Sequence, residues 1–204
     1  MDKLLPNIAE RCHHCRMHIN LCFCDLLIKM RTKVNVTVLM HYKEYAITTN
    51  TAHLIPKVLE NADIRFHGHK NKQPLDLSDI SQEQGTPLLL YPLTDTNILS
   101  PDFAKELKSP IHLFVPDGNW RQASHMIRRT PELATMKKVV LPIGAPSNYH
   151  LRHGPTPHHL CTYEAISRAL GILEGKEIQN KMDDVFHTMV NRVLYTRGKA
   201  KLKK

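Results

Sequence analysis

The stretch Ile111-His-Leu-Phe-Val-Pro-Asp-Gly-Asn-Trp120 decides how the rest of the chain is interpreted. Its first half is apolar and partly β-branched, which predicts a buried strand over 111–115, and the Pro-Asp-Gly that follows is a turn signal. A helix is predicted over 120–129, because Met126 and Ile127 fall on one apolar stripe. An acid, a glycine, an amide and an indole therefore lie where a strand is followed by a helix. In open α/β sheets ligands usually bind at this edge.

The same residues also have a simpler interpretation. Asp117 and Gly118 would then only form the turn, and Asn119 would only cap the helix. Trp120 would be an ordinary core aromatic. The other motifs of the chain have to decide between the two interpretations.

Composition narrows the class of protein. The 204 residues suffice for one α/β domain with a small appendage. No stretch has the apolar length of a membrane span, and the N-terminal residues do not resemble a signal peptide, so we expect a cytoplasmic protein without membrane contacts. The formal charge of +9, with 14 histidines besides, favours nucleic acid as a partner, the alternative being an inert basic surface. Only 6% of the residues are aromatic, so few rings are available to stack on the bases of a single strand. We therefore expect basic side chains to bind the phosphates of a folded RNA.

Four of the five cysteines form a dense cluster near the N-terminus. Its spacing, C-x2-C-x6-C-x-C, is made by Cys12, Cys15, Cys22 and Cys24. Four soft ligands at one point suit a tetrahedral metal better than disulfides in a cytosolic chain, so we predict structural Zn²⁺ with no position open for catalysis. His13, His14 and His18 are alternative ligands for one position. An iron–sulfur cluster or free thiols are the alternatives to zinc.

Strand and helix signals alternate along the chain and predict an α/β fold, with a mostly parallel sheet covered by helices on both faces. Strands are predicted over 34–40, 87–91, 111–115 and 137–143, and helices over 100–107, 120–129, 162–170 and 182–196, with a further helical pattern near 54–59 that contains Pro56. Thr162 is the predicted N-cap of its helix. The segment 64–71 is basic and contains glycine, which predicts a surface loop that contacts RNA. We expect a zinc-binding arm over 1–30, a catalytic domain over 31–197 and a basic disordered tail over 198–204.

The motifs, in their order along the chain, resemble the DTW-domain family, and within it the TapT-type tRNA-uridine aminocarboxypropyltransferases. The resemblance rests on the cysteine arm, His41-x2-Glu44, Thr49-Asn-Thr51, Leu89-Leu-Tyr-Pro92, Asp117-Gly-Asn-Trp120, Tyr149-x-Leu-Arg152 and Thr162-Tyr-Glu-Ala165. Two residues depart from the family's pattern: Asn119 replaces the threonine of D-x-T-W, and Cys161 replaces the serine of S-T-x-E-A. Asparagine keeps a side chain that can cap a helix or form hydrogen bonds, and cysteine is close to serine in size.

The resemblance implies a SPOUT-related enzyme with a C-terminal trefoil knot that binds S-adenosylmethionine. The implied reaction moves the 3-amino-3-carboxypropyl group of S-adenosylmethionine to N3 of a tRNA uridine, in the variable loop for bacterial members. tRNA is thus the implied partner, and the chain is expected to be a monomer or homodimer with no obligate protein partner.

The resemblance also implies roles for individual residues. Asp117 would take the proton from N3, and Trp120 would stack on a base or form a wall of the pocket. The implied cofactor-binding residues are Leu90, Tyr91, Pro92, Asp117, Gly118, Asn119, Leu141, Pro142, Leu151, Arg152, Thr162, Glu164 and Ala165. The implied RNA-binding residues are His41, Thr49, Asn50, Arg121, Arg128, Arg129, Lys199 and Lys201.

Two other functions fit the same sequence. A SPOUT-type RNA methyltransferase would use the same cofactor and transfer its methyl group instead. A non-enzymatic RNA-binding module would combine the zinc arm with the basic surface and would not need S-adenosylmethionine.

Overall fold

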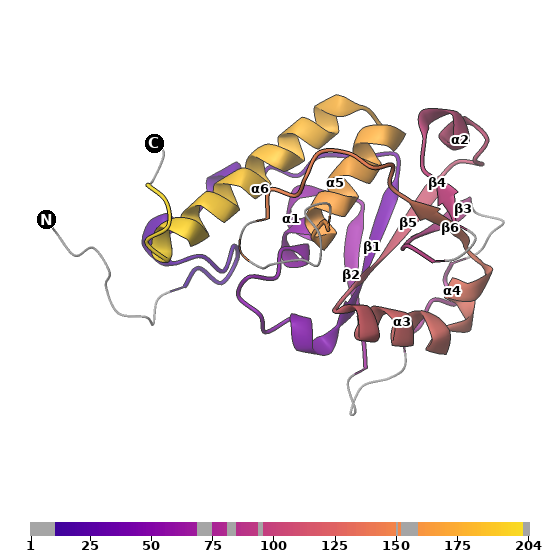
Figure 1. The fold of residues 1–204 in the computed structure, drawn as a ribbon, viewed down its shortest axis with the longest axis horizontal. Helices are drawn as coiled ribbons and strands as arrows, with labels where there is room; N and C mark the ends of the chain where they lie inside the picture. The colour runs from indigo at the N-terminus through magenta and orange to yellow at the C-terminus, as the bar shows by residue number, and fades with distance from the viewer. Residues whose placement is uncertain are drawn as a thin grey trace, which may run out of the picture.

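The structure is a computed structural model, and it describes residues 11–68, 75–80, 85–93, 96–149, 151 and 159–201. Within these residues six strands form one sheet in the order β2-β1-β5-β3-β6-β4, and every pair is parallel (Figure 1). The elements are η1 (Ile19–Leu21), η2 (Cys24–Leu26), β1 (Asn35–His41), η3 (Tyr42–Glu44), η4 (Ala52–Leu54), α1 (Ile55–Val58), β2 (Ala62–His67), β3 (Thr86–Leu90), β4 (Asn97–Ile98), α2 (Pro101–Lys105), β5 (Ile111–Asp117), α3 (Trp120–Arg129), α4 (Pro131–Thr135), β6 (Lys137–Val140), α5 (Thr162–Leu173) and α6 (Lys176–Thr196).

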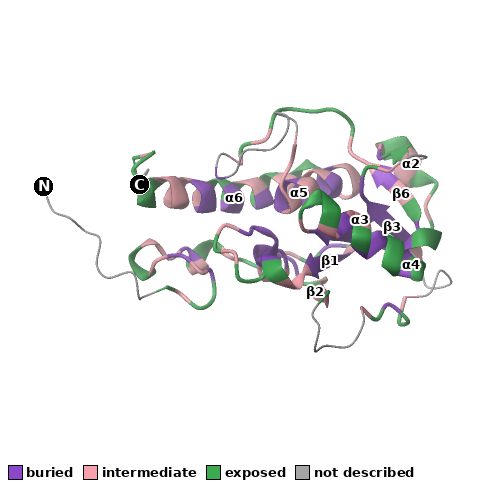
Figure 2. Cartoon of the chain, turned by 60° about the horizontal axis from the view of Figure 1, so that its bottom comes forward, coloured by how far each residue is buried: buried purple, intermediate pink, exposed green. Residues whose placement is uncertain are grey.

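The central strand β5 sends its side chains alternately to two hydrophobic cores, because successive residues of a strand point to opposite faces. Leu113 and Val115 belong to the larger core, and Phe114 belongs to the smaller one. The strands β1, β3 and β5 are therefore mostly buried, as the purple colour of β1 and β3 in Figure 2 shows, whereas the edge strands β2 and β4 contain no buried residue. The predicted α/β class with a parallel sheet and helices on both faces is confirmed.

The two helical layers come from different parts of the chain. Helices α5 and α6 pack against each other and over the larger core, while α3 and α4 cover the smaller core (Figure 1). Helix α3 has the predicted bounds, because Asn119 forms a capping box with Gln122 that fixes the first turn. Helix α6 begins earlier than the predicted 182, directly after Gly175.

Several sequence predictions about local structure are wrong. Residues 62–67 form strand β2 instead of a surface loop, since Ile64 and Phe66 pack on the larger core while the residues between them face the other way. The short strand β4 has no signal in the sequence. Cys161, not Thr162, is the N-cap of α5, and the Glu164 carboxylate accepts a hydrogen bond from its backbone N–H.

The N-terminal segment that contains the four clustered cysteines packs onto the larger core and onto α6. Met17 and Phe23 are buried in the larger core, and the Arg192 side chain of α6 donates to the backbone carbonyls of Leu21 and Cys22. A metal that orders the arm would therefore also support α6. In the described part of the chain, no helix combines the length and the apolar character of a membrane span.

Candidate active site

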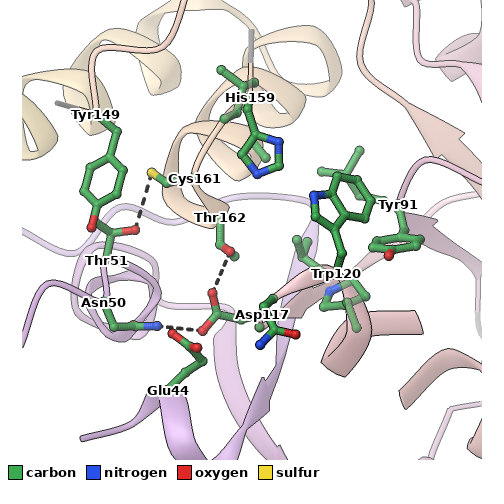
Figure 3. Close-up of a pocket in the computed structure, with 18 of the residues that line it drawn as sticks. Glu44, Asn50, Thr51, Tyr91, Asp117, Trp120, Tyr149, His159, Cys161 and Thr162 are labelled. Carbon is green, nitrogen blue, oxygen red and sulfur yellow. Dashed lines mark hydrogen bonds between the residues drawn. The ribbon is translucent and has the colours of Figure 1, made fainter. Parts of the chain in front are cut away.

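A pocket of about 390 Å³ lies at the carboxyl edge of the sheet, where β3 and β5 end. Its size falls within the range of small-molecule sites. The segments that follow β1, β3 and β5 line it together with Tyr149 and the start of α5, and Figure 3 shows side chains from each. The lining residues are Glu44, Thr49, Asn50, Thr51, Leu90, Tyr91, Pro92, Val115, Pro116, Asp117, Gly118, Asn119, Trp120, Ala123, Tyr149, His159, Leu160, Cys161, Thr162 and Ala165.

Asp117, the last residue of β5, is held from both sides. The Asn50 side-chain amide donates to its Oδ2 at 2.7 Å, and the Thr162 hydroxyl donates to its Oδ1 at 2.6 Å (Figure 3). The carboxyl is only 6% exposed, so these neutral donors offset part of the cost of burying its charge. These two hydrogen bonds fix the orientation of the Asp117 carboxylate at the pocket.

Asn50 is itself positioned by His53. The backbone N–H of His53 donates to the Asn50 side-chain oxygen at 3.2 Å, which leaves the amide N–H₂ of Asn50 turned to Asp117. The His53 ring lies 2.7 Å from the Asn50 carbonyl, and since a carbonyl can only accept, Nδ1 carries the proton. Burial lowers the pKa of His53 to about 4, so the ring is neutral.

Trp120 stands at the other side of the pocket and is not a core residue. It is 48% exposed, and its ring lies 5.4 Å from that of Tyr91 and 5.5 Å from that of His159. The Tyr91 hydroxyl lies 3.1 Å from the Ser124 hydroxyl, and this hydrogen bond connects Tyr91 to α3. The three rings form an aromatic wall with one accessible indole face, suited to a planar base.

Two separate hydrogen bonds connect the segments that line the pocket on the side opposite Trp120. The Tyr149 hydroxyl donates to the Thr49 carbonyl at 2.5 Å, and the Thr51 hydroxyl donates to the Cys161 sulfur at 3.4 Å. Burial raises the pKa of Cys161, so it remains a neutral thiol. This wall joins the segment after β1 to the start of α5.

The sequence-predicted ligand residues divide between two cavities. Leu90, Tyr91, Pro92, Asp117, Gly118, Asn119, Trp120, Thr162 and Ala165 line the main pocket, together with Thr49 and Asn50. Leu141, Pro142 and Glu164 line a second cavity of about 320 Å³ on a different face of α5. The Glu164 carboxylate there accepts from the Ser147 hydroxyl at 2.6 Å and from the Asn148 backbone at 2.8 Å. Leu151 is buried in the larger core, and Arg152 lies outside the described residues.

The basic residues predicted to bind RNA lie in two places. Arg121, Arg128 and Arg129 are exposed on α3, the helix whose first turn lines the pocket, whereas Lys199 and Lys201 are exposed beyond the C-terminal end of α6, at the other end of the molecule (Figure 1). The side chain of His41 packs against Gly118. Burial lowers the pKa of His41, and the positive charge of Lys43 acts in the same direction. His41 is therefore a neutral hydrogen-bonding group near pH 7.

The four arm cysteines meet in space. Their sulfur atoms all lie within 4.8 Å of one another, with Cys12 and Cys24 3.5 Å apart and Cys15 and Cys22 3.7 Å apart. A tetrahedral zinc with Zn–S bonds of about 2.3 Å separates its sulfurs by about 3.8 Å, so the four thiols fit Zn²⁺. Among the described residues, this group of mutually close ligand atoms contains the four cysteines and none of His13, His14 and His18.

The pKa values of these cysteines shift in opposite directions. The backbone N–H of Cys15, helped by that of His14, lowers the pKa of Cys12 to about 6. Burial, and then the neighbouring cysteine sulfurs, raise the pKa of Cys24. A divalent metal would stabilise all four as thiolates.

Some pocket residues had no role in the sequence-based prediction. Glu44, Tyr149 and Cys161 occur in the family motifs but were given no function, and His159 had no signal at all. Glu44 could have been found from its position, because it follows β1 at the same sheet edge as Asp117. His159 comes from a segment without periodicity, so only the folded chain brings it to Trp120.

Comparison with known proteins identifies the family of the chain. The chain is 28% identical over 193 residues to tRNA-uridine aminocarboxypropyltransferase 2 of Drosophila melanogaster, covering 90% of this chain and 75% of that protein. It is 25% identical over 174 residues to the Mus musculus protein of the same name, covering 81% of this chain but only 58% of the relative. The SAM-dependent rRNA:acp-transferase Tsr3 from Vulcanisaeta distributa has a similar fold, with a TM-score of 0.50, 17% identity and coverage of 80% of this chain and 79% of that chain. The DTW domain model matches residues 9–194, and the chain therefore belongs to the DTW-domain family.

Proposed function

We propose that the protein transfers the 3-amino-3-carboxypropyl group of S-adenosylmethionine to N3 of a uridine in tRNA, in the variable loop. The names of the family relatives support the reaction class and the tRNA substrate. The observation that carries the proposal is the oriented Asp117 carboxylate, which lies between Asn50 and Thr162 in a pocket that also presents an exposed indole.

Asp117 takes the N3 proton in this reaction. N3 of uridine is a weak acid and attacks only after losing that proton, so a carboxylate held in a fixed direction is the required partner. The new bond forms between N3 and the chain carbon attached to sulfur. The carbon–sulfur bond breaks with its electron pair passing to sulfur, and neutral methylthioadenosine leaves. Catalysis then depends on which carbon of the sulfonium faces N3.

The aromatic wall and the basic surface of α3 receive the RNA. Trp120 stacks on the target uridine, and the neighbouring exposed arginines Arg121, Arg128 and Arg129 bind phosphates. The adenosine of S-adenosylmethionine lies along the segment Leu90-Tyr-Pro92 at the end of β3. Arg152 binds the carboxylate end of the cofactor, while the Thr162 hydroxyl, which the sequence assigns to the same task, donates to Asp117.

The remaining features complete the proposal. Cys12, Cys15, Cys22 and Cys24 hold a structural Zn²⁺, which contributes no chemistry to the transfer. The C-terminal half forms the trefoil knot of SPOUT-related enzymes, and the enzyme acts in the cytoplasm as a monomer or homodimer.

One labelling experiment separates this reaction from its rivals. The protein is incubated with unmodified tRNA and with S-adenosylmethionine labelled either in the methyl group or in the carboxypropyl chain. Label transferred only from the chain is the expected result. Label only from the methyl group would indicate an RNA methyltransferase, and no transfer from either sample would favour an RNA-binding module. Nuclease mapping of the labelled tRNA then identifies the modified uridine.

A further inference from the structure

The pocket contains two acidic residues and no basic side chain among its described lining residues. Glu44 and Asp117 are both buried, with exposed fractions of 8% and 6%. The other ionisable lining groups are His159, Cys161 and tyrosine hydroxyls, and Cys161 is a neutral thiol. These two carboxylates offer charge-assisted contacts to a cationic group of a ligand.

The acids and the aromatic rings occupy different ends of the pocket. Strands β1 and β5 are neighbours, with Met40 paired to Asp117, so Glu44 follows β1 at the same edge. Figure 3 shows Glu44 beside Asn50 and Asp117, away from Tyr91 and Trp120. A ligand with a planar ring at one end and a cationic group at the other matches this division.

The two acids have different surroundings. Asp117 is fixed by the amide of Asn50 and the hydroxyl of Thr162, at the place where the sheet passes into the turn before α3. Glu44 is the last residue of η3, and its charge acts on the neighbouring His41. In Figure 3, Glu44 lies on the side of Asp117 that is away from the rings of Tyr91 and Trp120.

S-adenosylmethionine carries the matching charges. Its transferred chain ends in an ammonium and a carboxylate, and its sulfonium is cationic, whereas methylthioadenosine has lost both cationic groups. An enzyme that transfers the chain has to fix the far end of that chain, because otherwise the less hindered methyl carbon also reaches the nucleophile. A carboxylate beyond Asp117 is in the right direction to do so.

We propose that Glu44 binds the ammonium group of the transferred chain, so that the chain runs from the aromatic wall past Asp117 with its sulfur-bound carbon facing the nucleophile. This inference rests on the proposed function and adds a subsite to it. The subsite selects S-adenosylmethionine over its neutral thioether product, since the product has no ammonium for Glu44 to bind.

The test pairs a ligand change with a side-chain change. Calorimetry measures the affinities of S-adenosylmethionine and of its deaminated analogue for the wild type, Glu44→Gln, Glu44→Asp and Asp117→Asn. A charge-assisted bond predicts about 10- to 100-fold tighter binding of S-adenosylmethionine to the wild type. Glu44→Gln should lose this preference and Asp117→Asn should keep it. Glu44→Asp, which keeps the charge on a shorter side chain, should keep part of it.

A surface variant controls for the substitution itself. Glu60→Gln makes the same chemical change at an exposed residue outside the pocket, and it should keep the full preference. Circular dichroism verifies that each variant is folded. Wild-type preference in folded Glu44→Gln would overturn the subsite. If Glu44→Gln kept its preference for S-adenosylmethionine over the deaminated analogue but lost turnover, Glu44 would be a proton-transfer residue instead. A wild type that binds neither ligand would refute the proposed function, and the subsite with it.

Discussion

The Thr162 hydroxyl donates to the Asp117 carboxylate at 2.6 Å, which joins the first residue of α5 to the last residue of β5. A residue expected to cap its own helix therefore orients a carboxylate 45 positions earlier in the chain. The cap is left to Cys161, whose N–H is satisfied by Glu164. The start of α5 is thus part of the pocket.

Thr162→Val should destabilise the protein and reduce turnover together. The change removes the hydroxyl and keeps the shape, so the buried carboxylate of Asp117 loses one donor, at a cost of about 1.5–3 kcal/mol. Chemical denaturation and carboxypropyl transfer measure the two effects. Thr188→Val, on the exposed side of α6, is the matched control and should change neither. Unchanged turnover in Thr162→Val would remove this bond from the mechanism.

Asp117→Asn should abolish transfer while leaving S-adenosylmethionine binding nearly unchanged. The amide cannot take the N3 proton, and loss of a general base lowers kcat by about 10²- to 10⁴-fold. Single-turnover transfer and calorimetry with the same preparation separate chemistry from binding. If the variant turned over at the wild-type rate, Asp117 would only orient the substrate.

Trp120→Ala should weaken tRNA binding without lowering the melting temperature. The indole is half exposed and contributes little to the core, but stacking on a base is worth about 1–3 kcal/mol. We expect KM for tRNA to rise about 10- to 100-fold, with Trp120→Phe retaining most of the affinity. A variant with normal KM and a lower melting temperature would assign Trp120 a structural role only.

Metal removal should unfold the arm and loosen α6. Elemental analysis should find one zinc per chain, and Cys15→Ser should lose it, because the thiolates fill all four positions. Cys161→Ser is the matched control and should keep the metal, since Cys161 lies at the pocket and not in the cluster. A metal-free protein with an unchanged melting temperature would contradict the zinc prediction.

Stability should fall as the pH drops from 6.5 toward 4, in part because of His53. The unfolded state takes up a proton near the ordinary pKa of 6.5, whereas burial keeps the folded ring neutral down to about 4. The unfolded state binds more protons within this window, so the free energy of unfolding decreases on acidification, by about 3 kcal/mol for this group. Chemical denaturation at several pH values between 8 and 5 gives the free energy of unfolding as a function of pH. This free energy should change less with pH in His53→Leu than in the wild type.

The sequence predicted those elements whose signals are local. The bounds of α3 follow from Asn119 and the apolar stripe, and the parallel sheet follows from the alternation of strands and helices. Strand β2 was missed because its glycine-containing basic segment resembles a loop, and only pairing with β1 makes it a strand. The bond from Thr162 to Asp117 depends on how α5 packs against β5, which no local pattern reports.

The bond from Tyr149 to Thr49 spans 100 residues of chain, and it has a consequence for biosynthesis. The pocket has no closed wall until the segment around Tyr149 and helix α5 have left the ribosome, since domains fold as synthesis delivers them. A nascent chain that lacks its last third therefore has no site to offer either substrate. Once the chain is complete, a bound ligand stabilises the first and last thirds together, because binding to the folded state alone shifts the whole folding equilibrium.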